Sequence, residues 1–125
     1  MIPQRIVLVD DEPDIRTVAE IALSAIGGWE VRLAASGEEA LAQLAAAETD
    51  LILIDVMMPG MDGLGVLSRL RADPRWAKLP AIFMTAKVQQ REVAQYLALG
   101  ACGVIPKPFD PLELPQQIRT LVAPL

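Results

Sequence analysis

The segment Leu51-Ile52-Leu53-Ile54-Asp55 decides the fold, because four consecutive large apolar residues end on a single carboxylate. An unbroken apolar run of this length is typical of a strand with both faces buried, as in a parallel sheet covered by helices. The same pattern recurs in Ile6-Val7-Leu8-Val9, which ends on Asp10-Asp11, and in Ala81-Ile82-Phe83-Met84, which ends on Thr85. The sequence therefore predicts three buried parallel strands that each end in polar side chains.

Two weaker strand patterns complete the set. Residues 29–34 alternate apolar and polar side chains, which is typical of a strand nearer the edge of a sheet. Val104-Ile105 forms a shorter apolar segment, and Pro106 ends it. Together with the three buried runs, these segments predict a five-stranded sheet.

Helical patterns occupy the gaps between the strands. The first predicted helix ends at Gly27-Gly28. It places on one face the residues Ile15, Val18, Ala19, Ala22 and Ile26. The second begins with Ser36 as N-cap and Glu39 three residues later, which predicts a capping box. The remaining three are expected from about Leu64 to near Asp73-Pro74, over 88–99 with Val93, Tyr96 and Leu97 facing inward, and from about Pro115 onward.

A βα order repeated five times predicts one α/β domain that covers residues 1–125. Right-handed crossovers between parallel strands give a doubly wound sheet with helices on both faces, and the common order of five strands is 2-1-3-4-5, the flavodoxin-like arrangement. Ligands of such sheets bind beyond the carboxyl ends of the first and third strands. The chemistry is therefore expected just after Val9 and just after Ile54.

Composition excludes several classes of enzyme and partner. The chain has no histidine and one cysteine, Cys102, which rules out a Ser-His-Asp triad, a Cys-His nucleophile pair, histidine-containing zinc sites and an internal disulfide. A net charge of −5 and a pI near 4.6 argue against nucleic-acid binding by this domain. No apolar run reaches the roughly eighteen residues of a membrane span and no signal peptide is evident, so we expect a cytoplasmic protein without a membrane partner.

Three carboxylates are expected to crowd at the edge where ligands should bind. Asp10 and Asp11 follow the first strand, Asp55 follows the third, and neighbouring strands lie about 4.8 Å apart. Two like charges about 4 Å apart repel by about 4 kcal/mol at an effective dielectric near 20, so the cluster needs a shared proton or a bound cation. Oxygen ligands of this kind favour Mg²⁺. The alternative for Asp10-Asp11-Glu12 is N-terminal capping of the first helix.

Two further polar residues are expected at the same edge. Lys107 lies between Pro106 and Pro108, and this stiffened backbone favours an ammonium group held facing Asp55. The alternative for Lys107 is a rigid surface turn. Thr85 ends the fourth strand with a hydroxyl, for which the alternative is an ordinary hydrogen bond to the backbone.

Four blocks of sequence, in this order, resemble the receiver domain of response regulators in two-component signalling. They are Asp10-Asp11, Asp55 followed by Val-Met-Met-Pro-Gly-Met-Asp-Gly, Thr85-Ala86, and Lys107-Pro108-Phe109, and the resemblance covers nearly the whole chain. It implies that Asp55 accepts a phosphoryl group from a partner histidine kinase or histidine phosphotransfer protein. The domain would then switch protein–protein interactions in a phosphorelay, as a signalling domain rather than an enzyme.

The resemblance also implies how a metal ion and the phosphoryl group are held. Asp11 would bind Mg²⁺ directly and Asp10 mainly through water, with Asp55 and the backbone carbonyl of Met57 as further ligands.

On the other side of the phosphoryl group, the resemblance implies a hydrogen bond from the Thr85 hydroxyl, with Ala86 leaving room for that approach. Lys107 would pair with the phosphoryl oxygens, and its bond to Pro108 resembles the cis peptide of the family.

One position departs from the family pattern. The family usually carries an aromatic residue on the fifth strand, three residues before the lysine, and that residue turns inward when the threonine moves. This chain has Val104 there, so signalling is expected to use the loop after Thr85 instead. The face formed by the fourth helix, fifth strand and fifth helix commonly carries partner contacts in the family, which implies a homodimer or an output protein of unknown identity there.

Two other functions stay open. A pseudo-receiver would bind its partners without phosphorylation, and the presence of Asp55, Thr85 and Lys107 argues against it. A Mg²⁺-dependent phosphatase of the haloacid-dehalogenase type would carry its nucleophile in an Asp-x-Asp motif after the first strand. Here Asp10 and Asp11 are adjacent and the lone acid follows the third strand, which disfavours that activity.

Overall fold

The structure is a computed structural model that describes all of residues 1–125. Its strands form one sheet and are β1 (Arg5–Val9), β2 (Glu30–Ala34), β3 (Leu51–Asp55), β4 (Ala81–Thr85) and β5 (Gly103–Pro106). Every neighbouring pair is parallel, and the order across the sheet is β2-β1-β3-β4-β5. The predicted doubly wound topology is confirmed.

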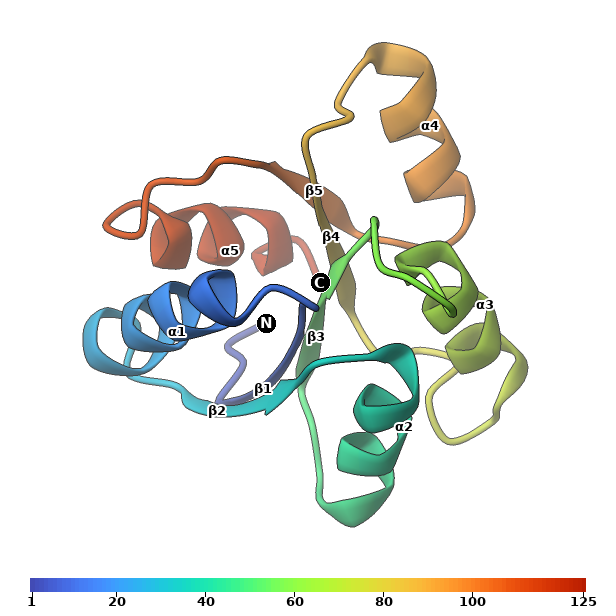
Figure 1. Ribbon diagram of the computed structural model, residues 1–125, viewed down its shortest axis with the longest axis horizontal. Helices are drawn as coiled ribbons and strands as arrows, with labels where there is room; N and C mark the ends of the chain where they lie inside the picture. The colour runs from blue at the N-terminus through green and yellow to red at the C-terminus, as the bar shows by residue number, and fades with distance from the viewer.

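Helices cover both faces of the sheet. They are α1 (Pro13–Ile21), continued by a π-helical segment η1 (Ala22–Ile26), then α2 (Gly37–Ala46), α3 (Gly63–Ala72), α4 (Gln90–Ala98) and α5 (Leu114–Val122). Figure 1 shows α1 and α5 on one side of the strands and α2, α3 and α4 on the other. No helix combines the length and apolar character that crossing a lipid bilayer requires.

The central strands are buried on both faces, which explains their continuous apolar sequences. Every residue of β3 and β4 is buried. In β1, Val7 and Val9 pack into the core beneath α2 and α3, while Ile6 and Leu8 pack into the core beneath α1 and α5. Each buried side chain of this size contributes about 1.5–3 kcal/mol relative to an exposed one. The sheet is therefore a rigid frame for the residues at its ends.

The first helix departs from the predicted pattern. In η1 the N–H of Gly27 donates to the carbonyl of Ala22, five residues back, at 2.9 Å. This wider turn brings Leu23 into the core and leaves Ile26 46% exposed. Val18 is also 40% exposed, whereas Ala19 and Ala22 are fully buried. The prediction that Val18 and Ile26 share the buried face was wrong.

The helix ends agree better with the sequence. The Ser36 hydroxyl accepts the N–H of Glu39 at 3.2 Å, as a capping box requires, although the Glu39 carboxylate reaches back to the N–H of Ala35 at 3.3 Å instead of Ser36. The expected start of α5 near Pro115 is confirmed within one residue.

In α4 the expectation for Leu97 was wrong. Tyr96 is buried as predicted, but Leu97 is 48% exposed and Val93 is half-buried. Tyr96 is the only buried residue of this helix, so α4 is attached to the core mainly through one aromatic ring.

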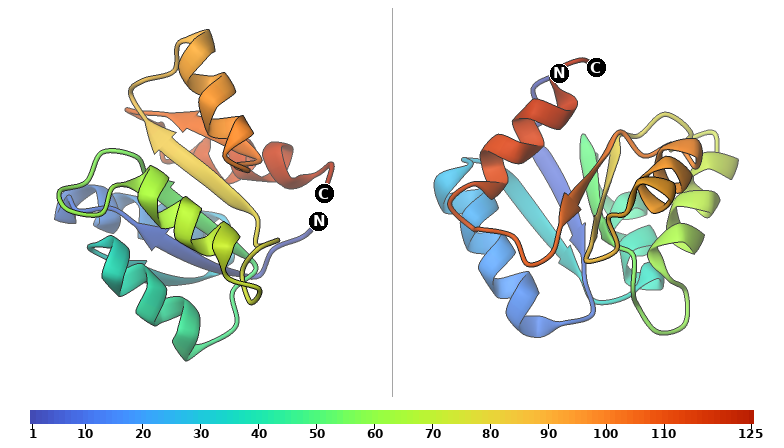
Figure 2. Two further views of the ribbon diagram at one scale, coloured as in Figure 1. Left: turned by 90° about the vertical axis from the view of Figure 1, so that its right-hand side faces the viewer. Right: turned by 90° about the horizontal axis from the view of Figure 1, so that it is seen from above.

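Both chain ends lie at the edge of the sheet where the strands begin. The Met1 ammonium donates to the carbonyl of Leu125 at 3.0 Å. Figure 2 shows the two termini side by side, on the opposite side of the molecule from the loops that follow the strands. Those loops carry the candidate site.

Candidate functional site

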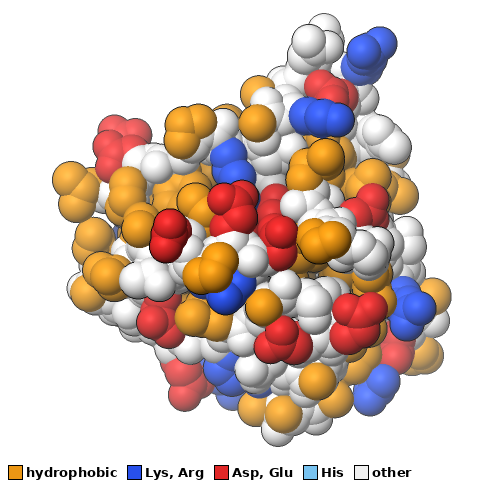
Figure 3. Space-filling view, in the orientation of Figure 1, with side chains coloured by type: hydrophobic (Ala, Val, Ile, Leu, Met, Phe, Trp, Pro, Cys, Tyr) orange, Lys and Arg blue, Asp and Glu red, His pale blue; other side chains and the backbone are white.

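The carboxyl edge of the sheet gathers the acidic side chains that the sequence singled out. Asp10 and Asp11 follow β1, and Asp55 is the last residue of β3. Because Val9 pairs with Ile54 in the parallel register, Asp10 and Asp55 reach the edge at the same level. Figure 3 looks onto this edge and shows acidic side chains gathered near its middle.

Asp10, Asp11 and Asp55 form one cluster of carboxylates. One oxygen atom from each lies within 4.8 Å of the others. Asp10 is fully buried, Asp55 is 2% exposed and Asp11 is half-buried. Three hard oxygen donors of this kind fit a hard divalent cation such as Mg²⁺, which takes carboxylates as ligands and retains several waters.

Asp10 is held by contacts from three directions. Its Oδ1 accepts the N–H of Glu12 at 2.9 Å, its Oδ2 accepts from the Lys107 ammonium at 2.6 Å, and its backbone carbonyl accepts from Arg16 at 2.7 Å. The capping alternative therefore describes part of what Asp10 does, since it satisfies an N–H at the start of α1. Asp10 can accept this N–H and still belong to the carboxylate cluster, because the two functions use different contacts of the residue.

Asp55 has one engaged oxygen and one free oxygen. Its Oδ1 accepts the N–H of Met57 at 3.2 Å and lies 3.3 Å from Nζ of Lys107, while Oδ2 takes part in no hydrogen bond. Burial, followed by repulsion from Asp10, raises the pKa of Asp55 to about 6, although Lys107 and the Met57 N–H oppose the shift.

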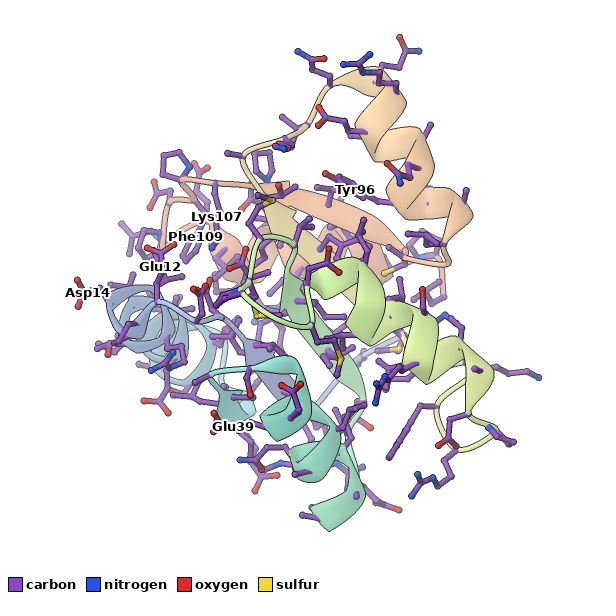
Figure 4. All side chains as sticks on the ribbon, turned by 45° about the vertical axis from the view of Figure 1, so that its right-hand side comes forward. Glu12, Asp14, Glu39, Tyr96, Lys107 and Phe109 are labelled. Atoms are coloured by element: carbon purple, nitrogen blue, oxygen red, sulfur yellow. The ribbon has the colours of Figure 1, made fainter.

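Lys107 approaches from the end of β5 and bridges the two buried acids. Its ammonium is closer to Asp10, at 2.6 Å, than to Asp55, at 3.3 Å. Burial alone would lower the pKa of Lys107. The hydrogen bond and charge of Asp10, and to a smaller extent those of Asp55, instead raise this pKa above its ordinary value. The Lys107–Pro108 peptide is cis. Figure 4 shows Lys107, Phe109 and Glu12 along the same edge.

The Thr85 hydroxyl does not touch the acids. Thr85 is 1% exposed at the end of β4, and its Oγ1 accepts the N–H of Lys87 at 3.0 Å, which is the backbone hydrogen bond that the sequence left as the alternative. Ala86 is exposed beside it. Met57 is 59% exposed, and the contact that it makes with the acids is the hydrogen bond from its backbone N–H to Asp55.

Gly63 was identified from the sequence only as the last residue of the block after Asp55, and Arg16 was not identified from it. Gly63 begins α3 so close to β3 that an added Cβ would overlap the carbonyl oxygen of Asp55 and lie 2.8 Å from Cα of Val56. Arg16 binds the carbonyl of Asp10. A signal for Arg16 existed, because a cation in the first turns of a helix opposes the helix dipole and needs a local acceptor.

A match to a known protein family accounts for this arrangement of acids, threonine and lysine. The family model of the response regulator receiver domain matches residues 6–119. The chain belongs to this family. The receiver domain is a signalling domain of two-component systems, which is the broad role that the acids, the threonine and the lysine had suggested.

Relatives and solved structures agree with this assignment. The chain is 42% identical over 119 residues to the probable transcriptional regulator ycf27 of Cyanophora paradoxa, and 38% identical over 121 residues to the response regulator Rre1 of Synechocystis. These matches cover 95% and 97% of the chain but 48% and 52% of the relatives, so the chain spans about half of their length.

Among solved structures, the chemotaxis protein CheY4 of Vibrio cholerae superposes with a TM-score of 0.88 and 31% sequence identity. That alignment covers 95% of this receiver domain and 98% of the CheY4 chain.

The raised pKa of Asp55 predicts a gain in stability when its charge is removed. The folded protein binds the Asp55 proton more tightly than the unfolded chain, whose carboxyl titrates near 3.8, so stability falls as pH rises from about 4 to about 6. Asp55→Asn should therefore unfold about 5 °C higher than wild type at pH 7 in the presence of a chelator. The gain should disappear near pH 4. Thermal unfolding at both pH values measures it, and an equal gain at both would contradict the assignment.

Asp50 supplies a matched control with the opposite sign. Its carboxylate accepts the backbone N–H of Arg5 at 2.9 Å and pairs with the Arg5 guanidinium at 3.3 Å. Burial alone would raise the pKa of Asp50, but the hydrogen bonds and charge of Arg5 and the Gln4 N–H lower it below its ordinary value. Asp50→Asn should therefore lower the melting temperature at pH 7 slightly, and not raise it.

Proposed function

We propose that this receiver domain accepts a phosphoryl group on Asp55 from the phosphohistidine of a partner histidine kinase or histidine phosphotransfer protein. The observation that carries the proposal is the free Oδ2 of Asp55, beside an Oδ1 fixed by Met57 and Lys107. A carboxylate oxygen without a hydrogen bond can attack phosphorus. The P–N bond to the imidazole then breaks as the new P–O bond forms, and the product is an acyl phosphate.

The residues around Asp55 provide positioning and charge neutralisation, which phosphoryl transfer needs more than covalent help. The Lys107 ammonium lies close enough to Asp55 to pair with a phosphoryl oxygen added there. We propose that the Thr85 hydroxyl turns from Lys87 to donate to a second phosphoryl oxygen. Ala86 presents only a methyl group next to this path.

The acidic cluster fits a requirement for Mg²⁺. We propose that Asp10, Asp11, Asp55 and the carbonyl of Met57 hold the ion, which when bound neutralises charge on the transferring group. Lys107 also compensates part of the charge of Asp10 and Asp55.

Phosphorylation would change which proteins the domain binds. A phosphoryl group adds up to about one further negative charge at this edge. We propose that an output protein, or a second copy of the chain, binds the face formed by α4, β5 and α5. A cavity of about 430 Å³ lies between β5 and α5 in the part of this face away from α4, lined in part by Val104, Gln117 and Leu121.

Intact mass after incubation with acetyl phosphate and Mg²⁺ tests the phosphoacceptor. One added phosphoryl group is expected, and it should require both Mg²⁺ and Asp55, so that Asp55→Asn shows none. A stable complex with beryllofluoride would support a phosphoacceptor whose acyl phosphate is too short-lived to detect. Neither adduct nor beryllofluoride complex would instead support a pseudo-receiver. Catalytic release of phosphate from small esters would support the phosphatase alternative.

A further inference from the structure

Tyr96 occupies the contact between α4 and the sheet. It is 3% exposed, and its ring lies 5.3 Å from that of Phe83 on β4, tilted by 60°. In Figure 4 the labelled Tyr96 lies between α4 and the strands. Phe83 in turn pairs with Ile54, the residue before Asp55. One buried aromatic pair therefore connects α4 to the strand that carries the proposed phosphoacceptor.

The hydroxyl of Tyr96 holds the loop that follows β4. It donates to the backbone carbonyl of Lys87 at 3.1 Å. The N–H of the same Lys87 donates to Oγ1 of Thr85 at 3.0 Å. Lys87 is thus fixed at both of its backbone polar groups, by Thr85 on the site side and by Tyr96 on the helix side.

Val104 cannot make an equivalent connection. It pairs with Phe83 across β4 and β5 and is half-buried, but its side chain has no polar atom that could sense a hydroxyl or a carbonyl. The aromatic ring and the hydroxyl that contact the loop belong to Tyr96 on α4 instead.

We propose that Tyr96 is the positioning residue that couples Thr85 to α4, an inference that rests on phosphorylation of Asp55. If the Thr85 hydroxyl turns toward a phosphoryl group, it leaves the N–H of Lys87, and Tyr96 becomes the remaining restraint on that residue. Because Tyr96 is the only buried residue of α4, movement of the Lys87 carbonyl transmits to the helix through it. In the unphosphorylated state the Tyr96 hydroxyl restrains the loop in its present position.

Tyr96→Phe tests this coupling, because it removes the hydroxyl and keeps the ring in the core. We expect it to raise the affinity of the domain for beryllofluoride with Mg²⁺ about three- to tenfold, since a restraint on the resting loop is lost. Ser24→Ala is the matched control, because it also removes a hydroxyl that donates to a backbone carbonyl, that of Glu20 at 2.7 Å, away from the site. Its affinity should equal that of wild type.

Tyr96 also provides a spectroscopic readout that a purely structural role would not move. It is the single tyrosine of the chain, so ring-labelled tyrosine gives one set of NMR signals. These signals should shift when beryllofluoride binds to wild type, and Thr85→Ala should suppress the shift even at a beryllofluoride concentration high enough to saturate its weaker site. An unchanged or lowered affinity of Tyr96→Phe, or a shift that persists in Thr85→Ala, would overturn the coupling alone. Failure of the wild type to bind beryllofluoride and to take up phosphoryl would overturn the proposed function with it.

Discussion

Replacing Gly63 by alanine should lower the free energy of unfolding by about 3 kcal/mol. A Cβ at this position would overlap the carbonyl oxygen of Asp55 and approach Cα of Val56 to 2.8 Å. Both are backbone atoms at the end of a central strand, which is buried on both faces and cannot move aside as a flexible side chain can. Thermal unfolding followed by circular dichroism should show a melting temperature about 10 °C below that of wild type.

Gly65→Ala is the control for this effect, because it adds the same methyl group to the same helix. The nearest atoms to its Cβ are Oδ1 of Asp62 and Cγ of Met61, both at 3.3 Å and both in side chains. Alanine is favoured over glycine inside a helix by about 1 kcal/mol, so this variant should be as stable as wild type or more stable. Equal losses for the two variants would show that the contact of Gly63 with the backbone of β3 is not the cause.

Lys107→Met should slow phosphoryl uptake from acetyl phosphate by about 10²- to 10³-fold, as expected when one donor to a developing negative charge is removed. The Lys107 ammonium lies 3.3 Å from Oδ1 of Asp55 and is held there by its 2.6 Å contact with Asp10. Methionine has a similar length but no charge. The rate of appearance of the phosphorylated mass, with Mg²⁺ in excess, measures the effect.

Metal binding separates loss of this donor from loss of the site. Lys107 competes with a cation for Asp10, so Lys107→Met should bind Mg²⁺ at least as tightly as wild type while it transfers phosphoryl slowly. Lys78→Met, which removes an exposed lysine away from this edge, should keep both the wild-type rate and the wild-type affinity. A Lys107→Met variant that loses Mg²⁺ binding would assign Lys107 to maintaining the cluster and not to phosphoryl transfer.

The strands were predictable because burial on both faces leaves a direct trace in the sequence. An apolar run such as 51–54 has few alternatives once its length and its polar end are considered. The face of α1 was not predictable in the same way. The π-helical turn of η1 changes the angle between successive side chains, and a pattern that assumes 3.6 residues per turn assigns Ile26 to the core in place of Leu23.

The candidate site was predictable to the level of which residues meet, but not of how they meet. Strand ends in a parallel sheet bring Asp10, Asp55 and Lys107 to one edge, whatever their side-chain conformations. The sequence does not show that the ammonium lies nearer to Asp10, because that choice depends on sub-ångström distances. The contact from Tyr96 to the carbonyl of Lys87 joins residues of two elements, and no spacing rule indicates it.

The contact between Met1 and Leu125 has a consequence for how this fold can be joined to other polypeptides. A domain fused to either terminus would be attached at the end of the molecule opposite to Asp55, where the strands begin. A change at Asp55 could then reach a domain attached there through the helices that run between the two ends of the sheet.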